Sequence, residues 1–171
     1  MQSYLFKNIQ VVNEGKIMFS DVLTHGERIE KIDNQINVAR RVTEINGENL
    51  HLFPGVIDDQ VHFREPGLTH KADIFSESRA AVAGGVTSFM EMPNTIPNAL
   101  TLDLLEDKYN IAASRSLANY SFYMGVSNNN TDEVLRAKKK KKSICGIKIF
   151  MGSSTGNMLV DRMASLRNIF G

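Results

Sequence analysis

Two polar side chains, Gln60 and His62, occupy alternate positions in a segment with the composition of a β-strand. Residues at i and i+2 of a strand point to the same face, so the two side chains can act on one ligand. Two histidines at this spacing would begin a zinc site, whereas glutamine offers only a neutral carbonyl oxygen, a poor zinc ligand beside imidazole. A single histidine at a strand end is more often a hydrogen-bonded structural residue, so the pair alone does not establish a metal site.

Three more residues capable of chemistry lie at or after the ends of predicted strands. Arg64 comes directly after the strand of His62, Asn94 follows the next strand, and Lys148 lies toward the end of the fourth. In parallel α/β folds, catalytic side chains gather at the carboxyl ends of the strands. The positions therefore predict one shared site.

Two of these residues also have a simpler interpretation. The planar fork of Arg64 suits a carboxylate ligand, but an exposed arginine could instead pair with Glu65. Lys148 lies in an apolar strand, where burial favours the neutral, nucleophilic amine, but it could also reach solvent or pair with an acid. Residue types alone leave these alternatives open.

The elements that position these residues follow an alternating pattern from Phe53 onward. Strands are expected at 56–63, 86–92, 120–126 and 144–151, and helices at 71–83, 102–116, 131–142 and 159–170. Gly84-Gly85 ends the first helix, and Thr101 and Thr131 could cap the second and third. Four βα units in series indicate the α/β class, with a parallel sheet covered by helices.

Residues 1–52 show a different sequence pattern, in which short apolar runs such as 4–6, 9–12 and 17–19 are separated by turn-forming residues. This pattern predicts a small β-rich domain over 1–52, followed by a second domain over 53–171. A closed barrel needs eight strands and typically about 250 residues. Four strands leave an edge unpaired, so we expect 53–171 to be the first half of a truncated barrel, or to need a partner for stability.

Composition excludes several classes of partner. The chain has 171 residues, 42% of them hydrophobic, and a formal net charge of +1, which favours neither nucleic acid nor a membrane. The lysine run 138–142 lacks interleaved aromatics and is interpreted as a solvated helix end. A single cysteine, no signal peptide and no long apolar span indicate a soluble, cytoplasmic protein.

Three motifs carry a resemblance to a known family. Residues 53–67 read FPGVIDDQVHFREPG, residues 91–95 read EMPNT, and residues 146–156 read GIKIFMGSSTG. In this order, each at a predicted strand, they resemble the first, second and fourth barrel strands of the amidohydrolase superfamily, and within it the dihydroorotases. The resemblance implies the N-terminal part of a (β/α)8 metal-dependent hydrolase barrel, about four βα units, preceded by a small β-sandwich domain. The 152–156 stretch, which lacks the ending of a P-loop, would be a loop over the active site.

The resemblance also implies roles for individual residues. His62 would ligate the more buried metal beside the substrate, and Lys148 would be the catalytic lysine whose carbamate bridges two metals. Gln60 stands where the family pattern has a metal-ligating histidine, which leaves one or two Zn²⁺ open. Arg64 and Asn94 would hold a substrate carboxylate.

The implied activity is that of a dihydroorotase, a hydrolase of C–N bonds in cyclic amides. It would reversibly hydrolyse the small molecule dihydroorotate to N-carbamoyl-aspartate in pyrimidine biosynthesis. The 171-residue chain alone is expected to be inactive, because the general base and further ligands come later in the family; a homo-oligomer is left open. The alternatives are another cyclic amidase of the hydantoinase or allantoinase type, a single-metal enzyme, or a catalytically silent homologue that supports a partner enzyme, as Gln60 suggests.

Overall fold

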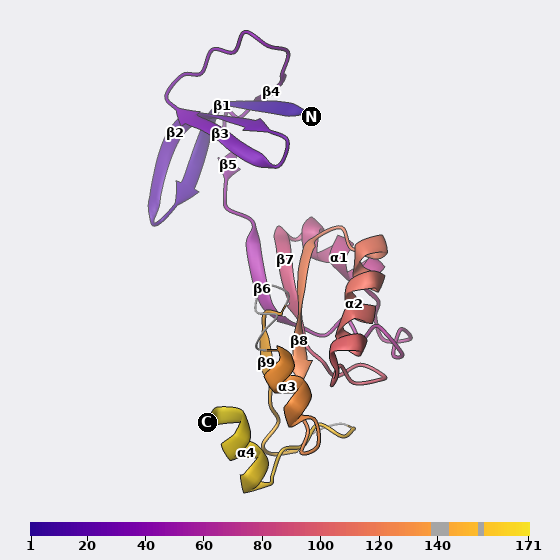
Figure 1. Cartoon of the computed structure of the whole chain (residues 1–171). Helices are drawn as coiled ribbons and strands as arrows, with labels where there is room; N and C mark the ends of the chain where they lie inside the picture. The colour runs from indigo at the N-terminus through magenta and orange to yellow at the C-terminus, as the bar shows by residue number, and fades with distance from the viewer. Residues whose placement is uncertain (138–143, 154–155) are drawn as a thin grey trace. The chain divides into compact units, whose positions relative to one another are not determined.

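The structure, a computed structural model, describes residues 1–137, 144–153 and 156–171, which form two compact units (Figure 1). The first unit comprises Met1–Pro54 and the second Gly55–Gly171. No helix within these described ranges is long and apolar enough to cross a membrane.

The first unit is built on a five-stranded mixed sheet. Its strands are β1 (Ser3–Asn13), β2 (Lys16–His25), β3 (Arg28–Asp33), β4 (Thr43–Asn46) and β5 (His51–Leu52). The order is β3-β2-β1-β4, with β5 also paired to β1. The apolar runs 4–6 and 9–12 belong to one continuous strand rather than two short ones, joined through a register irregularity at which Asn8 has a φ of 55°. Leu5, Leu23 and Ile36 form one of its buried clusters.

Within its described residues, the second unit contains a four-stranded sheet and four helices, in the alternating order that the sequence predicts. Its elements are β6 (Val56–Val61), α1 (Ile74–Ala83), β7 (Val86–Glu91), α2 (Leu102–Arg115), β8 (Asn119–Gly125), α3 (Thr131–Ala137), β9 (Gly146–Lys148) and α4 (Met163–Phe170). The strands pair in the order β6-β7-β8-β9, and every pair is parallel. The predicted α/β class with a parallel sheet is therefore confirmed.

One face of this sheet carries the core beneath the helices. Phe122, Met124 and Val126 alternate along β8 and its exit, and all three are fully buried. Phe122 belongs to the cluster that includes Ile74, Leu105 and Ala112 of α1 and α2. Met124 and Val126 belong to the cluster that α3 and α4 cover. Because the three side chains point the same way, the helices that pack on them cover the same face of the sheet.

Several predicted element bounds were wrong, and local contacts explain most of the differences. Helix α1 begins at Ile74 rather than at 71, because the Asp73 side chain accepts a hydrogen bond from the Ser76 backbone N–H at 2.9 Å and caps the helix. Thr101 caps α2 as predicted, accepting from the Leu104 N–H at 3.2 Å. Thr131 is the first residue of α3 rather than its cap.

The last βα unit is shorter than predicted. The strand expected over 144–151 is regular only at Gly146–Lys148. Helix α4 begins at Met163 rather than at 159, because Leu159 forms a parallel bridge with Phe150 and the Val160 N–H donates to the Phe150 carbonyl at 2.9 Å. Those bonds hold 159–160 in an extended conformation that a helix cannot share. The lysine run 138–142, predicted to end the third helix, lies outside the described residues.

Candidate active site

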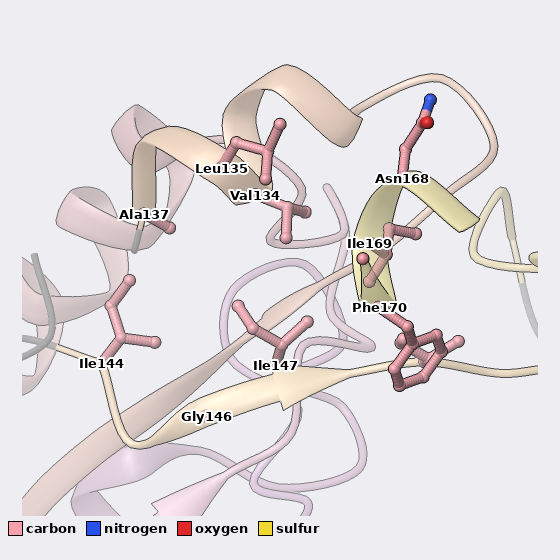
Figure 2. Close-up of a pocket in the computed structure, with 11 residues that line it drawn as sticks. Val134, Leu135, Ala137, Ile144, Gly146, Ile147, Asn168, Ile169 and Phe170 are labelled. Carbon is pink, nitrogen blue, oxygen red and sulfur yellow. The ribbon is translucent and has the colours of Figure 1, made fainter. Parts of the chain in front are cut away.

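His62 and Lys148 point away from the helix-covered core, and Gln60 is exposed at a register irregularity of β6. Val61 and Phe63 both pack in the core cluster under α1 and α2, so His62 between them points to the opposite side. At the other edge of the sheet, an apolar cavity of about 410 Å³ lies beneath α3 and α4, and Figure 2 shows Ile147 in its wall. Ile147 and Ile149 both line this cavity. Lys148 lies between them, and its side chain therefore points away from those helices.

Three of the predicted residues meet directly at the carboxyl ends of β6 and β7. Nδ1 of His62 lies 2.9 Å from Oδ1 of Asn94. Nη1 of Arg64 donates to the backbone carbonyl of Asn94 at 3.4 Å. Since an amide oxygen only accepts, Nδ1 of His62 is the donor in this bond, and in the neutral imidazole the lone pair is then on Nε2. Asn94 thus connects the predicted metal ligand to the predicted carboxylate-binding arginine.

A cavity of about 280 Å³ opens beside this group. It is lined by Arg64, Leu68, Lys71, Asn94, Thr95, Ile96, Asn98 and Gly156. Two of these side chains are cationic, none is acidic, and both asparagines offer amide groups, so the lining favours an anionic ligand with hydrogen-bonding edges.

Two parts of this lining differ in how well the sequence predicts them. Lys71 was not predicted as a site residue, because a lysine on a polar turn before a helix carries no distinguishing local signal. Gly156 comes from the loop expected over the site, of which 154–155 lie outside the described residues. A Cβ at Gly156 would approach Oδ1 of Asn98 to 2.6 Å, so the backbone there lies directly against the cavity wall.

The backbone of Arg64 adopts an uncommon conformation. Its φ is 69°, in the left-handed region that residues with a Cβ seldom occupy. The Arg64 N–H donates to Oε1 of Glu91 at 3.0 Å. Its side chain does not pair with Glu65, the simpler role considered above, because the buried Glu65 carboxylate instead binds the Arg115 guanidinium and accepts from the Ile74 N–H at 2.9 Å. The Arg64 guanidinium therefore remains available to the cavity.

The Glu91 carboxylate also contacts Lys108 of α2. Lys108 Nζ lies 2.9 Å from Oε2 of Glu91, and the two side chains are 1% and 0% exposed. Oε2 accepts no aligned hydrogen bond within the described residues, so this contact is an ion pair. Burial raises the pKa of Glu91 and lowers that of Lys108, and the attraction between the two charges opposes both shifts. The sequence gives one indication that Glu91 is buried: this acidic residue stands between Met90 and Met92 at the end of an apolar strand.

The fit of the implied metal can be tested residue by residue. His62 offers a free imidazole nitrogen with its second nitrogen fixed by a hydrogen bond, which is the usual arrangement of a metal-ligating histidine. Gln60 is exposed, and Lys148 lies on β9, at the opposite edge of the sheet from β6, with Nζ 5.1 Å from the Phe150 ring centroid. Among the described residues, no group of three or more His, Cys, Asp or Glu could hold a metal ion. They therefore fit one position of a metal shell, through His62.

Known proteins resemble the chain both in sequence and in fold. An allantoinase of Deinococcus radiodurans is 33% identical over 147 residues, which cover 85% of this chain and 32% of that protein. A dihydroorotase of Halobacterium salinarum is 34% identical over 152 residues, covering 88% and 34%. The solved structure of an L-hydantoinase (dihydropyrimidinase) from Arthrobacter aurescens matches with a TM-score of 0.88 at 26% identity, covering 99% of this chain and 38% of that one. No family model matches the chain.

These matches share two properties. The chain spans about a third of the length of the curated relatives it matches. The names of the relatives differ in substrate but all describe enzymes that open cyclic amides. The chain therefore resembles cyclic amidases of the amidohydrolase superfamily, in sequence over most of its length and in fold over nearly all of it.

Proposed function

We propose that this chain supplies the substrate-carboxylate half of a cyclic-amide hydrolase that acts on dihydroorotate, the dihydroorotase reaction of pyrimidine biosynthesis. The observation that carries the proposal is the cavity at the ends of β6 and β7, where Arg64 and Asn94 meet beside Lys71 and none of the described lining residues is acidic. Of the cyclic amides considered, dihydroorotate is the anionic one, while hydantoins and allantoin are neutral.

Arg64 would bind the substrate carboxylate through its planar fork, and the Asn94 amide would add a neutral hydrogen bond. A charge-assisted pair in a partly buried site is worth about 1.5–3 kcal/mol. When Arg64 and Asn94 hold the carboxylate, the substrate ring presents its amide bond at a fixed position. Such positioning is itself a large part of catalysis. Lys71 adds a second positive charge, which raises the local concentration of an anionic substrate.

His62 is the proposed metal ligand through Nε2. Lys148 lies on β9, at the opposite edge of the sheet, and would join a metal shell only as its anionic carbamate, because an ammonium group repels a metal ion. We propose zinc, which when bound would make hydroxide available near neutral pH and polarise the amide carbonyl. Hydrolysis adds the hydroxyl of water to that carbonyl carbon, breaks the ring C–N bond and leaves a proton on the departing nitrogen. Within this chain, Asn94 fixes the orientation of His62 through the 2.9 Å contact with its Nδ1.

The experiment compares substrates that differ in one carboxylate. In the natural protein that contains this chain, Arg64→Ala is expected to lower kcat/KM for dihydroorotate by about 10- to 100-fold, in proportion to the lost charge-assisted pair. Turnover of 5,6-dihydrouracil, the same ring without the carboxylate, should not change by more than about twofold. An equal loss for both substrates, or none for dihydroorotate, would contradict the proposal.

A second candidate is allantoinase activity. The allantoinase and dihydroorotase relatives are equally similar to this chain, at 33% and 34% identity. Allantoin has no carboxylate, so this activity would survive Arg64→Ala. Assay of the same protein with allantoin therefore separates the two candidates.

A further inference from the structure

A buried ion pair lies directly behind the carboxylate-binding group. Glu91 is the last residue of β7, Lys108 is on α2, and neither side chain reaches solvent. Taking two charges out of water is costly, and apolar residues of similar volume often stabilise a fold as well or better. Stability alone is therefore a weak reason for this pair to stand here.

Lys108 Nζ lies 4.9 Å from the centroid of the Phe122 ring, and the pair also makes one hydrogen bond to each loop that carries a binding residue. Oε1 of Glu91 accepts from the Arg64 N–H at 3.0 Å, in the loop after β6. Lys108 Nζ donates to the Met92 carbonyl at 3.1 Å, two residues before Asn94 in the loop after β7. The same two side chains thus fix the backbones from which Arg64 and Asn94 project.

The conformation of Arg64 shows why such a contact matters. A residue with a Cβ at a φ of 69° is held there against its preference. A hydrogen bond from its N–H to a buried carboxylate is charge-assisted and directional, and it constrains this backbone amide. Without it the peptide can relax to a negative φ, which turns the guanidinium away from Asn94.

From these contacts we infer that Glu91 and Lys108 are positioning residues for carboxylate recognition, setting the geometry of Arg64 and Asn94 from behind without touching the substrate. The inference rests on the proposed function, because it assigns the pair to the carboxylate-binding half of that site. It adds two specificity-determining residues on β7 and α2 that line no part of the cavity.

Two double variants of the natural protein test it. Glu91→Met with Lys108→Met removes the charges together with both backbone contacts, and unbranched methionines fill similar volume. Glu91→Gln with Lys108→Met also removes the charges but keeps an acceptor for the Arg64 N–H. The apolar variant is expected to raise KM for dihydroorotate about tenfold, with a smaller change in kcat and little change for 5,6-dihydrouracil. The neutral variant keeps the Arg64 contact and loses the Lys108 contact to Met92, so it should raise KM for dihydroorotate by a smaller factor of about threefold.

The control is Leu105→Ala. Leu105 is buried on the same helix, one turn before Lys108, and its apolar side chain cannot make a hydrogen bond to either loop. The Leu105→Ala variant should be less stable, because the substitution leaves a cavity in the core. It should leave the ratio of the KM values for dihydroorotate and 5,6-dihydrouracil unchanged. If it shifts that ratio as much as the apolar variant does, or if the apolar variant leaves the ratio unchanged, the inference is overturned.

A spectroscopic readout needs no activity. In the ¹H–¹⁵N spectrum of this chain, the Arg64 amide proton should lie downfield, move partly upfield in the neutral variant and lose its protection from exchange in the apolar one. If the apolar variant does not fold, the spectrum of the neutral variant is compared with that of the unmodified chain. An Arg64 amide resonance at the same position in both spectra would overturn the inference. A failure of the proposed function would be seen in a different experiment. In that case Arg64→Ala would leave the turnover of dihydroorotate unchanged, regardless of the results for the Glu91 and Lys108 variants.

Discussion

At the residue scale, the sequence identifies side chains with distinctive chemistry but not those that support them. Arg64, Asn94 and His62 could be predicted because each follows a strand in a short, recognisable motif, and the structure brings all three together. The partnership of Glu91 with Lys108 could not be predicted, because it joins a strand to a helix 17 residues later through contacts that leave no local pattern. The left-handed backbone of Arg64 is likewise set by tertiary contacts rather than by its side chain.

Gly67 offers a test of the backbone beside the cavity. Its φ is 82°, and a Cβ there would meet the Ile96 carbonyl oxygen at 2.0 Å. Gly85 has a similar φ of 88°, but a Cβ there would meet nothing within 4 Å. Gly85→Ala should cost about 1–2 kcal/mol for the left-handed backbone alone. Gly67→Ala should cost a further ~1–3 kcal/mol from the clash.

Urea unfolding of the two alanine variants measures this difference in the free energy of unfolding. Equal losses in the free energy of unfolding would show that the loop at Ile96 moves aside at little energetic cost. The part of the cavity wall formed by Ile96 would then be more flexible than the contacts indicate.

At the scale of elements, the order of strands and helices could be predicted, but not all of their ends. Apolar periodicity and glycine punctuation are local properties, so the four βα units and the end of α1 at Gly84 follow from them. The start of α4 depends on the pairing of Leu159 with Phe150, a contact that periodicity cannot indicate. The start of α1 depends on a side chain, Asp73, whose capping role competes with the helical pattern that precedes it.

The Asp73 cap predicts a pH dependence. The hydrogen bond from the Ser76 N–H, with a smaller contribution from Arg115, holds the pKa of Asp73 below its ordinary value. A carboxyl group with a depressed pKa in the folded state stabilises the fold above its unfolded pKa of about 3.9, and this stabilisation is lost as pH falls through the folded value. Asp73→Asn keeps a capping oxygen but does not titrate.

The free energy of unfolding of the unmodified chain should therefore exceed that of Asp73→Asn at pH 7, and the two should converge below about pH 4. Urea titrations at several pH values measure the difference, in which the titration of all other groups cancels. Parallel curves down to pH 3 would show that the cap does not depend on its charge.

At the scale of the whole molecule, the described part of the second unit leaves both edges of its sheet unpaired. β6 and β9 each pair on one side only, and apolar residues are exposed on them: Ile57 is 63% exposed and Ile147 is 39% exposed. Such edges favour association with other chains. The cavity lined by Ile147, Ile169 and Phe170 adds apolar surface at the β9 edge (Figure 2).

The 171-residue chain is therefore expected to self-associate as its concentration rises, and Ile57→Lys should weaken that association. Sedimentation velocity over a concentration series measures it. Val82→Lys, at an exposed apolar position on helix α1 rather than on an edge strand, is the matched control. A chain that remains monomeric throughout, or an equal effect of both lysines, would contradict this expectation.

The strand order β6-β7-β8-β9 is also the order of synthesis. When each of the later strands leaves the ribosome, the strand with which it pairs has already been synthesised. The helix that covers the two strands lies between them in the chain. Loop closure is short at every step, so each βα unit can be added to a growing sheet without waiting for distant sequence. The residues around the cavity, at the ends of the first two strands, would then be the earliest part of this sheet to take shape during translation.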